Sequence, residues 1–173
     1  MAKLTLVTGG AGYFGSLLTA ELLDRGHAVR VFDLNSYDGR PPGLESVRGD
    51  VRDVEAIGKA CHGVDVVFHN VAQVPLAKDK ALFWSVNRDG TKNLLEAARR
   101  NGVRKVVYTS SSAVFGVPRQ NPVREDTVPA PMEDYGKAKL EGERLCLEYA
   151  GKGLEVAVIR PRTTSASSVA VSL

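Results

Sequence analysis

Four glycines within seven residues constrain the fold of this chain more than any other feature. Residues 9–15 read GGAGYFG, after a short apolar run at residues 4–7 and before leucines at helical spacing in residues 13–25. This order is typical of a buried strand, a glycine turn and a helix. A helix start has unpaired N–H groups and the positive end of the helix dipole, so it attracts a phosphate, and glycine leaves room for one.

The glycines fit two spacings that occur in dinucleotide-binding turns. Gly10, Gly12 and Gly15 give G-x-G-x-x-G. Gly9, Gly12 and Gly15 give G-x-x-G-x-x-G. Either match alone is weak evidence. Here, however, a predicted strand precedes the glycine turn, a predicted helix follows it, and Asp33 ends a second apolar run 18 residues after Gly15. A carboxylate there accepts hydrogen bonds from a ribose diol and repels a 2′-phosphate, which favours NAD over NADP. Because these features agree, we interpret Asp33 as a cofactor residue in preference to a solvated aspartate in a loop.

Length and composition favour one ordinary globular domain. The 173 residues are 43% hydrophobic and 25% charged, with a formal net charge of +3. This charge is too small to indicate nucleic acid, and the basic cluster at residues 99–105 suits a helix end. No run approaches the roughly 20 apolar residues of a membrane span, and the start of the chain lacks a signal-peptide pattern. We expect no nucleic-acid or membrane partner, and a cytoplasmic protein.

The cysteines and histidines form no recognisable metal or redox motif. Cys61 and Cys146 lie outside any C-x-x-C sequence, and the three histidines lack the spacing of metal ligands. We therefore expect no metal site and two reduced, partly buried thiols.

Apolar runs and helical periodicity alternate along the chain. The sequence predicts strands at residues 4–7, 28–33, 44–48, 64–68, 103–108 and 154–160. It predicts helices at residues 13–25, 53–61, 80–100 and 133–150. In the second helix we expect Asp53 to be the N-cap, with Val54 and Ile57 facing inward.

This alternation predicts an α/β fold with a doubly wound parallel sheet. Right-handed βαβ units with six strands indicate a Rossmann fold of order 3-2-1-4-5-6. Ligands of such sheets bind at the carboxyl ends of the strands. The glycine turn, Asp33, Asp50, Val71 and Ser111 all fall at such ends.

Tyr135 and Lys139 are four residues apart and would share one helix face. An unperturbed tyrosine has a pKa of about 10, and a nearby ammonium together with a cationic nicotinamide would lower it. The tyrosine could then take a proton from a sugar or alcohol hydroxyl as hydride leaves the carbon, with Ser111 bonded to the same oxygen. Alone, this pair would more simply indicate an amphipathic surface helix, but the nucleotide turn and serine-rich strand end favour catalysis.

The chain resembles the NAD-dependent epimerase/dehydratase family, in the extended branch of the short-chain dehydrogenase/reductase superfamily. The resemblance runs through nearly the whole chain. The matching motifs are TGGAGYFG at 8–15, Asp33, Asp50-Val51, Asn87 with Gly90-Thr91, VYTSSSAVFG at 107–116, Tyr135-x-x-x-Lys139 and Arg160-Pro161.

The resemblance implies a role for each matching residue. The cofactor-binding set would be Gly9, Gly12, Tyr13, Phe14, Gly15, Asp33, Asp50, Val51, Val71, Ala72, Asn87, Tyr135 and Lys139. Within it, the glycine turn would admit the pyrophosphate and Asp33 would hold the adenosine ribose. Asp50 and Val51 would flank the adenine. Asn87 would support the active site, and the remaining members at 71–72 would line the nicotinamide ribose.

The catalytic set implied by the resemblance is Ser111, Tyr135 and Lys139. Tyr135 resembles the catalytic base, and Lys139 its partner and a ribose ligand. With this set and NAD, we expect an epimerase/dehydratase-type oxidoreductase that acts on a nucleotide sugar by transient hydride transfer. The alternatives are an enzyme of the hydroxysteroid dehydrogenase or flavonol reductase kind, and a cofactor-binding fragment without turnover.

Two segments depart from the family pattern. Residues 70–72 read NVA, with Asn and Val where the family more often has small residues. Residues 161–173 form an atypical Ser/Thr-rich tail where the family continues into a further strand and a substrate domain. We expect an NAD-binding domain at residues 1–160 whose substrate domain is missing, through C-terminal truncation, an alternative end or a shifted reading frame. The apolar strand at 154–160 would then be an exposed edge that favours a homodimer or other association.

Overall fold

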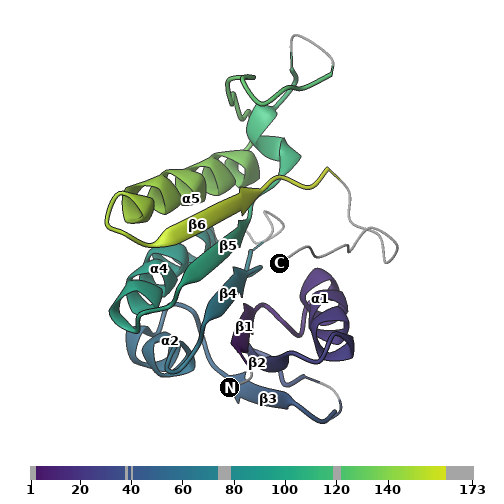
Figure 1. Cartoon of the computed structure of the whole chain (residues 1–173). Coiled ribbons are helices and arrows are strands. Elements are labelled where there is room, and N and C mark those ends of the chain that lie inside the picture. The colour runs from purple at the N-terminus through teal and green to yellow at the C-terminus, as the bar shows by residue number, and fades with distance from the viewer. Residues whose placement is uncertain (1–2, 38, 40, 74–78, 119–121, 163–173) are drawn as a thin grey trace.

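Six parallel strands form one sheet in a computed structural model that describes residues 3–37, 39, 41–73, 79–118 and 122–162 (Figure 1). The strand order is β3-β2-β1-β4-β5-β6, which confirms the predicted Rossmann order. The strands are β1 (Leu4–Thr8), β2 (Ala28–Asp33), β3 (Leu44–Arg48), β4 (Val66–His69), β5 (Lys105–Thr109) and β6 (Glu155–Ile159). The tail predicted to be atypical lies almost wholly outside the described residues.

Helices cover both faces of the sheet. They are α1 (Tyr13–Asp24), α2 (Val54–Ala60), α3 (Lys80–Trp84), α4 (Thr91–Arg100) and α5 (Asp134–Ala150). Figure 1 shows α1 on one side of the strands and α2, α4 and α5 on the other. Successive strand residues point to opposite faces, so Leu6 packs under α2, α4 and α5 while Val7 packs under α1. No helix among the described residues is long and apolar enough to cross a bilayer.

The predicted helix at residues 80–100 is interrupted by a π-helical segment at Ser85–Gly90. The Asn87 side chain explains this departure, because its amide donates to the Phe83 carbonyl and also pairs with the backbone of Gln73. The Thr91 hydroxyl donates to the Asn87 carbonyl at 2.8 Å. Side-chain bonds therefore compete with the regular helical ladder, as is common where a helix borders a functional site.

One inward-facing assignment was wrong. Val54 is 61% exposed, because it begins α2 directly after the N-cap and projects from the first turn, whereas Ile57 is fully buried. Asp53 does cap the helix, since its carboxylate accepts hydrogen bonds from the backbone N–H groups of residues 55 and 56. Cys61 and Cys146 are free thiols, more deeply buried than expected.

Helix α5 lies unusually close to β5 because Gly142 has no side chain. A Cβ built at Gly142 would collide with the hydroxyl of the buried Tyr108. Gly58, in the interior of α2, has open space where a Cβ would stand. The two helical glycines therefore have opposite structural roles.

We expect Gly142→Ala to lower the free energy of unfolding by roughly 1–3 kcal/mol, because α5 must move away from β5. Gly58→Ala is the matched control, and it should raise this free energy by about 0.5–1 kcal/mol through helix propensity alone. Urea unfolding of both variants measures the difference. Equal effects of the two substitutions would contradict the close packing of α5.

Candidate cofactor and active site

The glycine turn fixes the start of α1 against the carboxyl end of β1. Gly9 has a φ of +70°, and its N–H donates to the Phe32 carbonyl at 2.9 Å. A Cβ at Gly15 would run into the Gly9 carbonyl, so α1 can approach this closely only with glycine there. Gly12 is the N-cap and offers no side-chain cap, which leaves first-turn N–H groups for an external acceptor.

Asp33 holds the outer side of this turn. Its Oδ2 accepts a hydrogen bond from Ala11 N at 3.1 Å, and its Oδ1 accepts one from Asn35 N at 3.0 Å. The carboxylate thus ties the end of β2 to the glycine turn. It also lines the adjoining cavity, where a ribose diol could bond to it.

The first cavity has a volume of about 200 Å³ and lies at the carboxyl ends of β1, β2 and β4. It brings together most of the cofactor residues that the sequence predicts. Its lining includes Gly9, Gly12, Asp33, Asp50, Val51, Val71 and Ala72, with Asn70 and Gln73 beside them. The side-chain-free N-cap Gly12 and the Asp33 carboxylate in one cavity are the features that a dinucleotide site requires.

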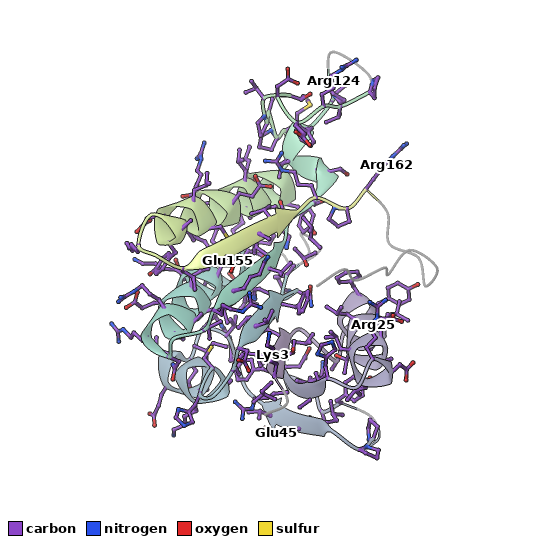
Figure 2. All side chains as sticks on the ribbon, in the orientation of Figure 1. Lys3, Arg25, Glu45, Arg124, Glu155 and Arg162 are labelled. Atoms are coloured by element: carbon purple, nitrogen blue, oxygen red, sulfur yellow. The ribbon has the colours of Figure 1, made fainter. Side chains whose placement is uncertain are left out.

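A second cavity of about 310 Å³ holds the predicted catalytic residues. Its lining is Phe14, Asn70, Ala72, Thr109, Ser110, Ser111, Tyr135, Lys139, Pro161 and Arg162. Asn70 and Ala72 line both cavities, so the two meet there. Figure 2 shows Arg162 beyond the carboxyl end of β6 and Glu155 at its start, so this cavity also belongs to the carboxyl edge of the sheet.

Three predicted cofactor residues line neither cavity. Gly15 is one of them, because it packs directly on the Gly9 carbonyl. Tyr13 is 64% exposed at the start of α1, where only its backbone could serve a ligand. Asn87 is buried, and its side chain pairs with the backbone of Gln73, which itself lines the first cavity. Asn87 therefore supports the cavity wall instead of forming it.

Lys139 is a buried ammonium group that donates to a backbone carbonyl. Its side chain lies in a residue only 3% exposed, and Nζ donates to the Thr109 carbonyl at 2.7 Å. Nζ lies 5.8 Å from the ring centroid of Tyr135 and 5.2 Å from that of Tyr108. Burial lowers the pKa of Lys139 to about 8. The remaining N–H groups of this amine can serve a ligand in the second cavity.

Tyr135 is not yet activated by these neighbours. Burial raises the pKa of Tyr135 above its ordinary value, a hydrogen bond with Ser111 opposes this, and the charge of Glu133 adds to it. The sequence predicts a lowered pKa from Lys139 and a cationic nicotinamide acting together. Within the chain itself burial prevails, so a further positive charge is needed to favour the phenolate.

Comparison with known proteins decides the family. The model of the NAD dependent epimerase/dehydratase family matches residues 5–168. The chain belongs to this family. Two solved structures with bound NAD share its fold, the UDP-glucose 4-epimerase of Brucella ovis and a short-chain dehydrogenase/reductase superfamily protein of Agrobacterium tumefaciens. The Brucella ovis enzyme has a TM-score of 0.83 and 31% identity, over 92% of this chain and 51% of its own. The Agrobacterium tumefaciens protein has a TM-score of 0.82 and 36% identity, over 91% of this chain and 48% of its own.

Curated relatives include more than one kind of enzyme. The Sinorhizobium fredii protein y4nG is 56% identical, over 94% of this chain and 41% of its own length. The UDP-glucose 4-epimerase of Streptomyces lividans is 37% identical, over 89% of this chain and 50% of its length. The 3 beta-hydroxysteroid dehydrogenase/Delta 5-->4-isomerase of Mycobacterium tuberculosis is also 37% identical, over 90% and 45%. The chain therefore spans half or less of these relatives.

NAD is the cofactor of this family, and the predicted preference for it agrees with the NAD-bound structures of neighbours. Below the two cavities, however, lie supporting residues that the sequence motifs did not single out. Two of these residues are buried and carry titratable side chains, and each connects a predicted site residue to the rest of the fold.

His69 is the first such support. The Thr91 hydroxyl gives its one hydrogen to the Asn87 carbonyl, so it must accept from His69 Nε2 at 3.1 Å. His69 Nδ1 then carries no proton and accepts from the Thr8 hydroxyl at 2.7 Å. This neutral imidazole joins the strand before the glycine turn to Thr91 at the start of α4. From the sequence, His69 was one of three scattered histidines, and only the tertiary contacts reveal its role.

Glu143 is the second support. Its carboxylate accepts two hydrogen bonds from the Arg160 guanidinium, at 2.8 and 2.6 Å, and one from the Ser110 hydroxyl at 2.5 Å. Backbone bonds from Ser110 N to the carbonyl of residue 159, and from Ser112 N to that of Pro161, flank the same turn. Ser111 is thus fixed from both sides. Glu143 could have been found from the sequence, because it follows Lys139 by four residues and so shares its helix face.

We expect His69 to make folding sensitive to acid. Burial, with a smaller effect of the Lys139 charge, lowers the pKa of His69 to about 3. The unfolded chain takes up this proton near pH 6.5 and the folded chain does not, so stability falls as the pH drops below 6.5. The loss should be on the order of 3 kcal/mol by pH 4.

The measurement is urea unfolding from pH 7 to pH 4. His69→Gln keeps a donor and an acceptor without a titrating ring, so its stability should fall less steeply with acid than that of the wild type. His62→Gln, at an exposed histidine, is the matched control and should follow the wild type. Parallel curves for all three proteins would show that His69 titrates normally in the folded chain.

Proposed function

We propose that this chain is the NAD-binding and catalytic half of an epimerase/dehydratase-type enzyme that acts on a nucleotide sugar. One observation carries the proposal: Ser111, Tyr135 and Lys139 line a cavity that meets, at Asn70 and Ala72, the cavity of the glycine turn and Asp33. A cofactor that binds beside Asp33 can therefore extend to the predicted base. The chemistry itself lies in the second cavity.

NAD, when bound, supplies the acceptor for hydride from the substrate carbon and adds the positive charge that Tyr135 lacks. Tyr135 Oη then takes the proton of the substrate hydroxyl, so the alcohol is oxidised to a carbonyl as the hydride leaves. The Ser111 hydroxyl orients the same substrate oxygen. Lys139 favours the tyrosinate and is itself held by the Thr109 carbonyl.

A steroid or related alcohol is the second candidate substrate. The same identity of 37% links the chain to a UDP-glucose 4-epimerase and to a 3 beta-hydroxysteroid dehydrogenase. Oxidation of either substrate, a nucleotide sugar or a steroid, would require the same proton and hydride transfers at one carbon. The described residues form the shared half of the reaction, so substrate trials with both classes decide between them.

The proposal predicts that the 173-residue chain binds NADH in preference to NADPH. Asp33→Asn removes the charge that repels a 2′-phosphate but keeps an oxygen acceptor, so the preference should shrink by about tenfold, or roughly 1.4 kcal/mol. Titrations followed by nicotinamide fluorescence measure it, with Asp24→Asn on the exposed side of α1 as control. Failure of the wild-type chain to bind either nucleotide would overturn the proposed cofactor site.

Tyr135→Phe should lower turnover of an accepted nucleotide sugar or steroid by roughly 10²- to 10⁴-fold, because the base is lost. NADH affinity should change little, since the ring remains in place. Tyr37→Phe removes a partly buried hydroxyl of a residue that does not line the second cavity, and serves as control. Turnover that survives in Tyr135→Phe would exclude Tyr135 as the base.

Self-association is a further expected property of this chain. Strand β6 is the edge of the sheet within the described residues, and its Val158 and Ile159 are 37% and 40% exposed. Light scattering should show a mean mass that rises with concentration, and Val158→Lys should suppress this rise. Val54→Lys, at an exposed valine on α2, is the control. A constant monomer mass at all concentrations would contradict it.

A further inference from the structure

The side-chain amide of Asn70 has an unusual bonding state. Asn70 directly follows β4, and its backbone N–H donates to the Thr8 carbonyl at 3.1 Å. The Thr109 hydroxyl donates to Asn70 Oδ1 at 2.7 Å. Asn70 Nδ2 is buried and has no hydrogen-bond partner among the described residues.

Such an arrangement is costly unless something else accepts the hydrogen bond. More than about 90% of buried polar groups in proteins have a partner, and leaving a donor unpaired costs roughly 1–3 kcal/mol. Among the described residues, Thr19 Oγ1 is the other buried side-chain atom without a partner. Thr19 is in α1 and lines neither the first nor the second cavity, whereas Asn70 lines both.

We propose that Asn70 Nδ2 donates a hydrogen bond to an oxygen in the central part of the bound dinucleotide. This inference rests on the proposed function. A dinucleotide that reaches from Asp33 to Tyr135 must pass the junction of the two cavities, and Asn70 is the amide at that junction. The pyrophosphate and the ribose next to nicotinamide both present oxygen acceptors of this kind.

Thr109 is the positioning residue for this contact. Its carbonyl accepts from Lys139 Nζ at 2.7 Å and its hydroxyl donates to Asn70 at 2.7 Å. One residue at the end of β5 therefore orients two nitrogen donors at the second cavity. The asparagine is also one of the positions at which this chain departs from the small residues of the family, so no family motif assigns it this role.

The test compares Asn70→Leu, which removes the amide, with Asn70→Asp, which keeps the shape and the oxygen that Thr109 holds. Both should weaken NADH binding in a fluorescence titration of the full chain, Asn70→Leu by about threefold to tenfold. Asn70→Asp should weaken it further if the acceptor is the pyrophosphate, because two negative charges would then face each other. Thr109→Val should also weaken binding, and Thr109→Ser, which keeps a hydroxyl, should bind more tightly than Thr109→Val.

Shorter ligands identify the oxygen. If Asn70→Leu weakens binding of ADP, the acceptor is the pyrophosphate. If it weakens binding of ADP-ribose but leaves ADP unchanged, the acceptor is the second ribose. AMP, which occupies the Asp33 end alone, should bind the variant and the wild type equally. Calorimetric titration measures these three ligands, which lack the fluorescent ring.

Thermal unfolding of the chain alone separates a ligand contact from a structural one. The double variant Asn70→Leu/Thr109→Val removes the unpaired donor together with the hydroxyl that donates to Asn70, so its unfolding midpoint should be at or above that of the wild type while its NADH affinity falls. A lower midpoint together with weaker AMP binding would overturn the inference in favour of a purely structural role. NADH binding by Asn70→Leu equal to that of the wild type would overturn it and leave the proposed function standing. A wild-type chain that binds none of the four ligands would overturn both.

Discussion

The contact between Gly15 and the Gly9 carbonyl sets the geometry on which the rest of the site depends. With no Cβ at Gly15, the start of α1 lies directly on the turn that leaves β1. This places the free N–H groups and the positive dipole end of the helix at the carboxyl edge of a parallel sheet. Asp33, Asn70 and Ser111 reach the same edge because parallel strands all end there. Tyr135 and Lys139 reach it from the first turns of α5.

Three buried polar groups hold this edge in place, and each avoids an isolated charge in a different way. His69 is buried as a neutral ring between two hydroxyls. Glu143 keeps its charge because Arg160 pairs with both carboxylate oxygens. Lys139 has a backbone carbonyl and two aromatic rings near it, so burial weakens its hold on a proton. Breaking one member of such a group leaves the other member unpaired, which makes these positions more sensitive than their distance from the cavities suggests.

The two cavities differ in what the chain completes. Around the glycine turn, Asp33 and Val51, the wall is made by the ends of strands and by the turns that follow β1, β2, β3 and β4. The second cavity is bordered by Pro161 and Arg162, at the limit of the described residues. Cofactor selectivity therefore depends on Asp33 in the first cavity, whereas the choice between a sugar and a steroid depends on groups that would face Tyr135 from the other side.

The sequence by itself determined the class of fold, the strand order and most residues of the candidate site that line the two cavities, since glycine spacing, alternating apolar runs and the Tyr135–Lys139 interval are local patterns with few structural solutions. It did not determine the π-helical segment, the exposure of Val54 or the raised pKa of Tyr135. Those depend on what packs against each group, which local patterns do not contain. The clearest case is Asn70: the sequence shows only an unusual residue after a strand. The tertiary structure brings Thr109 against its oxygen, leaves its nitrogen unpaired, and places it where the two cavities meet.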